Sequence, residues 1–337
     1  MKLEKTWIWR VVLLGVIGVA AKLAAAQLPS PALLVVVKDE NALAIVDVKA
    51  GKVVGRVPVG DGPHEVAASE DGKLAFVSNY GPQNAAIPGS SLSVIDLATR
   101  KELRRVEIGS RSRPHGVLVT GGKVYFTAEG FKLIGRYDPA VNKIDWMLGT
   151  GQNRTHLVVL SKDLSKIVTS NIESNTLSLF EAASEPLAWS GTVIPVGQGP
   201  EAVDLSPDGK EAWTATFRDH GISIVDVAAK KVAQTLTVDV KRANRLKFTP
   251  DGKRVLISDM EGGELVVLDA VGRKESKRVK VGSRPTGILI LADGSRAYVA
   301  VSGDNNIAIL DLKTFEITER ISTGANPDGM AWVDTRY

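Results

Sequence analysis

The chain repeats one order of short segments along almost its whole length. One unit starts at Gly62-Pro63-His64, then passes through an apolar run, an Asp-Gly-Lys turn and a second run that ends with Ser78-Asn79. A third run ends with an acidic residue, which recurs at steps of 49, 42, 43, 45, 43 and 42 residues, at Asp47, Asp96, Asp138, Glu181, Asp226, Asp269 and Asp311. A period of about 40 to 45 residues with four short strands is typical of propeller blades. The repeat therefore predicts an all-β fold, a seven-bladed β-propeller with four-stranded antiparallel blades.

The turns between the first two strands of each unit agree with this prediction. Five units have dipeptides that tolerate the positive φ angles of tight hairpins, at Asp71-Gly72, Gly121-Gly122, Asp208-Gly209, Asp251-Gly252 and Asp293-Gly294. One unit has Asp163-Leu164-Ser165 instead. Because leucine disfavours positive φ, we expect a looser turn in that blade.

The two ends of the chain complement each other. Residues 33–37, 42–47 and 53–59 resemble second, third and fourth strands without a first strand, and residues 329–333 resemble a first strand alone. Pairing these pieces would complete the seventh blade and hide strand edges that are otherwise open to other chains. We therefore predict one propeller domain over residues 27–337, closed by its C-terminal strand, and we expect a monomer.

Residues 1–26 have the three regions of a secretory signal peptide. Lys2, Lys5 and Arg10 precede an apolar run at 11–21, and three alanines follow at 24–26. The run is too short for an ordinary spanning helix, so we expect cleavage, no membrane span afterwards, and a periplasmic or secreted protein. A retained anchor is the alternative. Without this segment the formal charge falls from +4 to about +1, which gives no support to nucleic-acid binding. The absence of cysteine excludes disulfides and thiol catalysis.

The order of motifs resembles the YVTN-type β-propeller repeat family of exported bacterial proteins. The family pattern is Pro-His, Ser-x-Asp-Gly-Lys, aromatic-Val-Ser-Asn and Ser-Val-Ile-Asp, here at residues 63–64, 69–73, 76–79 and 93–96. The resemblance covers nearly all of the chain after residue 26 and implies the propeller fold. Such propellers include binding proteins, enzyme subunits and lactone-hydrolysing relatives, so the resemblance does not select a function.

The candidate site lies where the repeat varies. First strands of a propeller are innermost, so their first residues and the last residues of the second strands surround one mouth of the channel. The residue before the entry pair is arginine in four units. The Asn that ends the second strand is kept at Asn79 and Asn171, and we expect its place to be taken in the other units by Glu129, Thr216, Asp259, Val301 and, at the ring closure, Lys38. We predict a ligand site made by Arg113, Arg154, Arg242, Arg284, His64, His115, His156, Glu201, Asn79, Glu129 and Asp259.

Guanidinium groups recognise carboxylate and phosphate through paired hydrogen bonds, so this set favours an anionic small molecule or a protein partner held without catalysis. The alternative is that the arginines pair with Glu129, Glu201, Asp259 and Asp328 and only solvate the rim. A lactonase-like hydrolase or a metal-dependent enzyme that uses these carboxylates and histidines also stays open. So does single-stranded nucleic-acid binding, which would use the arginines with nearby aromatic residues. We predict no catalytic residue, no cofactor and no metal.

Overall fold

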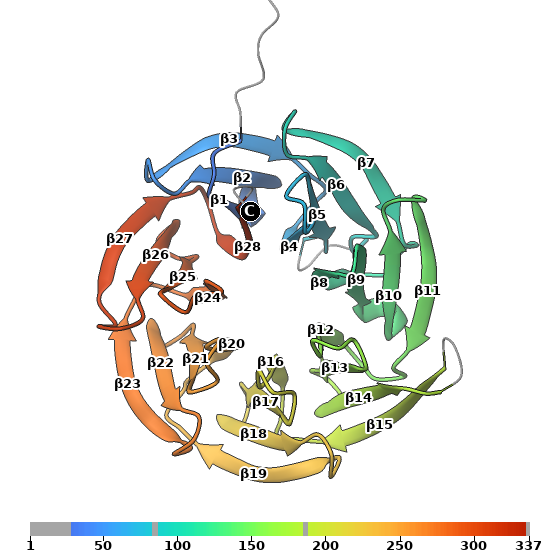
Figure 1. The fold of residues 1–337 in the computed structure, drawn as a ribbon, viewed down its shortest axis with the longest axis vertical. Coiled ribbons are helices and arrows are strands. Elements are labelled where there is room, and N and C mark those ends of the chain that lie inside the picture. Colours follow the sequence, from blue (N-terminus) through green and yellow to red (C-terminus); the bar gives the residue numbers. More distant parts are fainter. Residues whose placement is uncertain (1–27, 83–86, 185–187, 335–337) are drawn as a thin grey trace, which may run out of the picture.

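The computed structural model describes residues 28–82, 87–184 and 188–334. The predicted signal peptide lies outside these residues. The strands form seven four-stranded antiparallel sheets that stand in a ring around a central channel, as Figure 1 shows. This architecture confirms the predicted seven-bladed β-propeller. In each blade the first strand is innermost and the fourth is outermost.

The blades follow one another around the ring in chain order. The first three are β4 (Pro63–Ala68), β5 (Leu74–Asn79), β6 (Ser91–Asp96), β7 (Lys101–Glu107); β8 (Pro114–Thr120), β9 (Lys123–Ala128), β10 (Leu133–Asp138), β11 (Lys143–Gly149); and β12 (Thr155–Leu160), β13 (Lys166–Asn171), β14 (Thr176–Ala182), β15 (Trp189–Pro195). The next three are β16 (Pro200–Leu205), β17 (Glu211–Thr216), β18 (Gly221–Asp226), β19 (Lys231–Thr237); β20 (Ala243–Phe248), β21 (Arg254–Asp259), β22 (Glu264–Asp269), β23 (Lys274–Lys280); and β24 (Pro285–Ile290), β25 (Arg296–Val301), β26 (Asn306–Asp311), β27 (Ile317–Ser322).

The seventh blade joins the two ends of the chain. It consists of β28 (Pro327–Val333), β1 (Ala32–Val37), β2 (Ala42–Asp47) and β3 (Lys52–Pro58). Strand β28 runs antiparallel to β1, with Leu34 opposite Ala331 and Val35 opposite Met330. The predicted ring closure is therefore confirmed. Short 3-10 turns follow β1 and β9, at η1 (Lys38–Glu40) and η2 (Glu129–Phe131). Over the described ranges, no helix has the length and apolar character needed to cross a membrane.

The hydrophobic core lies between the blades. One cluster combines Leu34 and Ile45 of the seventh blade with Val77 and Ile95 of the first, and all four side chains are fully buried. Middle strands are covered by a neighbouring blade on each face, which explains their continuous apolar runs. The outermost strand β7 instead alternates exposed and half-buried residues. Packing face to face in this way fixes each first strand relative to the next.

Buried hydroxyl groups connect the innermost strands to one another. Thr127 Oγ1 donates to the carbonyl oxygen of His156 in the next blade at 2.6 Å and accepts the N–H of Gly116 in its own blade at 2.8 Å. Ser78 bridges its own blade and the His115 carbonyl in the same way, at 2.7 Å. These hydroxyls hold the backbone of residues that face the channel.

The turn at Leu164 differs from our expectation. Leu164 adopts φ +58°, and its N–H donates to the carbonyl oxygen of Ser161 at 2.9 Å. Gly72 makes the same bond to Ser69 at 2.9 Å. The expected looser turn is therefore wrong. Asp163 accepts hydrogen bonds from both Ser161 and Ser165, and these bonds hold the leucine in the left-handed conformation.

Candidate ligand site at the channel mouth

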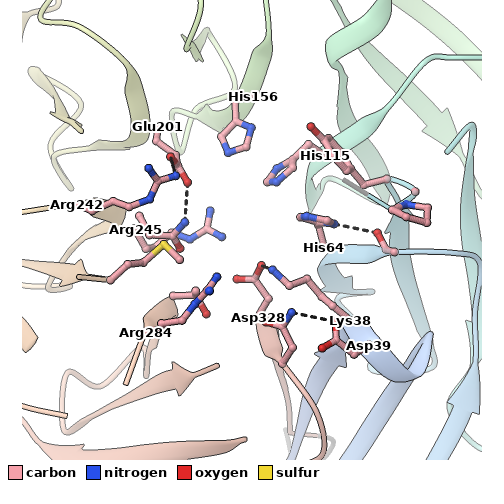
Figure 2. A pocket seen from close by; sticks show the side chains of 18 of the residues that line it. Lys38, Asp39, His64, His115, His156, Glu201, Arg242, Arg245, Arg284 and Asp328 are labelled. Atoms are coloured by element: carbon pink, nitrogen blue, oxygen red, sulfur yellow. Dashed lines mark hydrogen bonds and ion pairs between the residues drawn. The ribbon is translucent and has the colours of Figure 1, made fainter. Parts of the chain in front are cut away.

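A cavity of about 760 Å³ occupies the channel mouth. Its lining comes from the starts of the innermost strands and from the turns beside them (Figure 2). It includes seven of the eleven predicted residues, namely His64, His115, His156, Arg154, Glu201, Arg242 and Arg284. The cavity lining also includes Asn41, Tyr80, Met260 and Glu261, which the sequence did not predict for the site.

A β-bulge at the start of each innermost strand directs these side chains inward. In the first blade, Pro63 pairs with Asn79 but the next regular pair is Val66 with Val77. His64 thus leaves the hydrogen-bonded ladder and faces the channel. The residue before the strand is left-handed in several blades, with φ +57° at Arg154 and +52° at Arg284. Bulges commonly re-aim a side chain in this manner.

One wall of the cavity consists of stacked rings. The ring centroids of His64 and Tyr80 are 4.4 Å apart, those of His64 and His115 are 5.0 Å apart, and those of His115 and His156 are 3.7 Å apart. Burial lowers the pKa of His64 to about 4, with Lys38 adding repulsion. Burial also holds the pKa of His115 well below its ordinary value, and the neighbouring histidines contribute. His64 Nδ1 donates to the Gly62 carbonyl at 2.9 Å, so its Nε2 carries the lone pair.

Glu129 organises this wall from behind. It accepts a hydrogen bond from His156 Nδ1 at 2.6 Å and another from the Tyr80 hydroxyl at 2.7 Å. Arg154 lies 3.6 Å from the same carboxylate. Burial alone would raise the pKa of Glu129, but the His156 hydrogen bond and the nearby charges lower it. Glu129 is therefore a carboxylate that fixes the orientation of the His156 ring.

Glu129 does not occupy the register that the sequence predicted. Pro114 pairs with Ala128, whereas Pro63 pairs with Asn79, so Glu129 is equivalent to Tyr80 and follows the strand end. The predicted equivalence of Glu129 and Asn79 is wrong by one residue. Lys38 is displaced in the same way, because Pro327 pairs with Val37.

Three other predicted residues are not part of the cavity lining. Asn79 is buried inside its blade, where it accepts the Gly60 N–H at 3.1 Å and donates to Ser91 and Ser93. Asp259 accepts backbone N–H groups of Lys241, Arg242 and Gly262. The Arg113 guanidinium lies 4.4 Å above the centroid of the Tyr80 ring. The first two hold turns in place, and Arg113 supports the ring wall from outside.

The opposite wall carries guanidinium groups. In Figure 2, Arg242, Arg245 and Arg284 face the three histidines across the cavity. Arg242 is 3.8 Å from Glu201 and stacks 4.6 Å above the Phe217 ring. Glu201 accepts its shorter hydrogen bond from Asn244, at 2.7 Å. The Arg284 side chain makes no hydrogen bond or ion pair with any residue that the structure describes.

These contacts support only in part the alternative in which every arginine pairs with a rim carboxylate. Arg154 and Arg242 do have such partners, at 3.6 and 3.8 Å. Asp328 is instead paired with Lys38 at 2.9 Å. Arg284 has no carboxylate partner among the described residues.

Arg245 closes the cavity below and was missed by the sequence analysis. It forms a buried ion pair with Glu65, which comes from a blade across the channel. Arg245 also lines a second cavity of about 450 Å³ further along the channel, so the ion pair lies between the two cavities. A sequence signal existed. The third residue of the entry run is charged only at these two places and is otherwise Gly116, Leu157, Ala202, Gly287 or Gly329.

The histidines do not form a metal centre in this arrangement. No group of three or more His, Asp or Glu side chains within the described parts of the chain is arranged to hold a metal ion. The ring wall is stacked, with His115 and His156 tilted by 34° relative to each other.

Neither a family model nor a curated protein matches the chain. Solved structures do share the fold. Hydrazine synthase of Kuenenia stuttgartiensis matches with a TM-score of 0.69 and 18% identity over 81% of this chain and 90% of that one. A protein from Bacteroides uniformis, provisionally named a 6-phosphogluconolactonase, gives 0.73 and 16% over 90% and 99%. A functionally unknown protein from Desulfotomaculum acetoxidans gives 0.73 and 12% over 90% and 99%. Likeness at these identities defines the class as a β-propeller, and membership of the YVTN repeat family stays a prediction from the sequence.

Proposed function

We propose that this protein is an exported propeller of the YVTN repeat type that binds an anionic small ligand in its mouth cavity. The observation that carries the proposal is Arg284. Its side chain lines the cavity and has no charged partner among the described residues. Arg242 lies beside a carboxylate only at 3.8 Å and is held by an aromatic ring. A carboxylate or phosphate would give both groups the paired hydrogen bonds that a guanidinium prefers.

Calorimetric titration of the chain from residue 27 onward with a panel of organic carboxylates and phosphates tests this proposal. Arg284→Ala should weaken the binding of any ligand found by about 10- to 100-fold, because it removes a charge-assisted hydrogen bond. Arg320→Ala, on the outermost strand β27, is the matched control and should leave the affinity unchanged. Binding that is equal in all three proteins would refute the proposed site.

The hydrogen bond between His156 and Glu129 favours a second candidate function, a lactonase-like hydrolase. A carboxylate that binds Nδ1–H leaves Nε2 as the atom that accepts a proton, as in a general base. His156 Nε2 would take a proton from water while the water oxygen bonds to the lactone carbonyl carbon. The ring C–O bond would then break, and the leaving oxygen would take up a proton to give a hydroxy acid. Lactone turnover that disappears in His156→Gln would support this function over binding alone.

A further inference from the structure

We propose that the mouth cavity selects a flat aromatic carboxylate, with the ligand ring against His64, Tyr80 and His115 and its carboxylate at Arg242 and Arg284. This inference rests on the proposed function and specifies the class of ligand. It follows from the division of the cavity into two chemically different walls, which Figure 2 shows facing each other.

The ring wall is continuous and uncharged. His64 lies 4.4 Å from Tyr80 and 5.0 Å from His115, and Tyr80 meets His115 edge-on at 5.3 Å and 90°. Such a surface offers both ring faces and ring edges. An aromatic ligand interacts with these more favourably than an aliphatic ligand does. Desolvation keeps His64 and His115 neutral, so an apolar ring can contact them without removing water from a charged imidazole.

The wall is also rigid before any ligand arrives. Glu129 fixes Tyr80 and His156 through short hydrogen bonds, and Arg113 covers the Tyr80 ring at 4.4 Å. His64 is held by the Gly62 carbonyl. Little side-chain freedom is left to lose, which favours recognition of a rigid ligand.

The guanidinium wall supplies the charge at the other side. Arg242 is already stacked on Phe217, so its orientation is partly fixed, and Arg284 has no competing partner in the described residues. The ion pair of Arg245 with Glu65 lies between this cavity and the next one along the channel. A ligand that spans from one wall to the other therefore needs a ring at one end and an anion at the other.

A polar atom in the ring wall points to the same ligand. His115 is 5% exposed, and its Nδ1 makes no hydrogen bond with any described residue. A buried polar atom without a partner is costly and is explained by a group that the site is built to receive. A polar substituent or heteroatom on the aromatic ring, next to His115, would meet that requirement in addition to the ring and carboxylate that the proposal needs.

The test compares three ligands of one size in calorimetric titrations of the chain from residue 27 onward. 2-Naphthoate has ring and charge, decahydro-2-naphthoate has the charge without aromaticity, and 2-naphthamide has the ring without charge. We expect 2-naphthoate to bind about two- to tenfold more tightly than its saturated analogue, which is the usual gain from an aromatic pair. The amide should bind at least about tenfold more weakly than 2-naphthoate, because it forms no charge-assisted bond.

The outcomes separate the two proposals. Equal binding of both carboxylates would overturn the aromatic selectivity and leave the anion site standing. An amide that binds as tightly as the carboxylate would overturn the anion site. No binding by any of the three would overturn the selectivity for this ligand class, while the wider anion panel would still decide the proposed function.

Two variants then locate the ligand. His64→Leu should remove the preference for the aromatic carboxylate, whereas Arg284→Ala should weaken both carboxylates alike. Phe131→Leu is the matched control, since Phe131 is 42% exposed and does not line the cavity. If His64→Leu does not fold, saturation-transfer NMR on the unmodified protein replaces it. Stronger transfer to the ring protons of 2-naphthoate than to those of the saturated analogue is expected, and equal transfer would contradict the inference.

Discussion

The backbone conformation at the channel mouth does not favour arginine. Arg154 and Arg284 have φ values of +57° and +52°, and Gly62 and Gly199 take the same position in other blades at +53° and +70°. A residue with a Cβ atom is held in this conformation at a cost of order 1 kcal/mol, which glycine avoids. The arginine side chains must therefore have a role that offsets this conformational cost. A role in binding agrees with this requirement.

His64 gives the first prediction, which concerns pH. Its pKa falls from an ordinary value of 6.5 to about 4 because it is buried. Between these values the unfolded chain binds more protons than the folded one, so the free energy of unfolding decreases as the pH falls through this window. Denaturant titrations at pH 7 and pH 4.5 should show that His64→Gln loses about 2 kcal/mol less than the unmodified protein on acidification. An equal loss in both proteins would mean that His64 is not buried as a neutral ring.

Single residues of the site could be predicted from the sequence where the repeat determines their place. The entry residues and the arginines before them were found in this way, and seven of the predicted eleven line the cavity. The repeat marks Arg245 and Glu65 as charged third residues of the entry run, but it does not show that they are partners. The two residues are 180 positions apart, and they meet only because the ring is closed.

At the scale of strands, buried hydroxyls connect each blade to the next. Thr127 is fully buried between Gly116 and the carbonyl oxygen of His156. This bond holds the strand that presents His156 to the cavity. Other blades repeat it with Ser78, Ser170 and Ser258.

Thr127→Val tests the importance of this bridge. The substitution keeps the side-chain shape but removes a donor and an acceptor from the core, so the free energy of unfolding should fall by about 1 to 3 kcal/mol. Thr235→Val on the exposed surface of β19 is the control and should change it by less than about 0.5 kcal/mol. Denaturant unfolding followed by fluorescence measures both. If the two variants are equally stable, the bridge does not hold the blades together.

The position of Glu129 shows where reasoning about strand register went wrong. The hairpin of the second blade is short, since β8 ends at Thr120 and β9 begins at Lys123. From entry residue to strand end there are 14 steps in this blade and 16 in the first, as the pairs Pro114 with Ala128 and Pro63 with Asn79 show. Hairpin lengths change by two because a change of one would turn every side chain to the other face. That rule would have placed Glu129 beside Tyr80 from the sequence alone.

At the scale of the whole molecule, the fold was predictable because seven similar units leave one arrangement that buries all of their faces. Regular spacing fixed the number of blades, and the incomplete ends fixed how the ring closes. The cavity was less predictable, since its walls combine residues from blades that are far apart in the sequence. The distribution of charge between paired and unpaired arginines depends on distances of a few ångströms, such as the 3.8 Å between Arg242 and Glu201, which a repeat pattern does not contain.

The closure of the ring by β28 leads to the last prediction. All of β1 is fully buried, and Leu33, Leu34 and Val35 pair with residues 330–332. Ending the chain after Gly329 would expose this apolar strand as an open edge, which invites pairing with other chains. We expect a protein that is insoluble or much less stable, measured by thermal melting and size-exclusion chromatography. Ending the chain after Asp334 keeps β28 and should change neither the solubility nor the melting temperature. A chain that lacks residues 330–337 but stays soluble and melts within a few degrees of the full-length protein would contradict closure as the source of stability, because the ring would then hold together without its final strand.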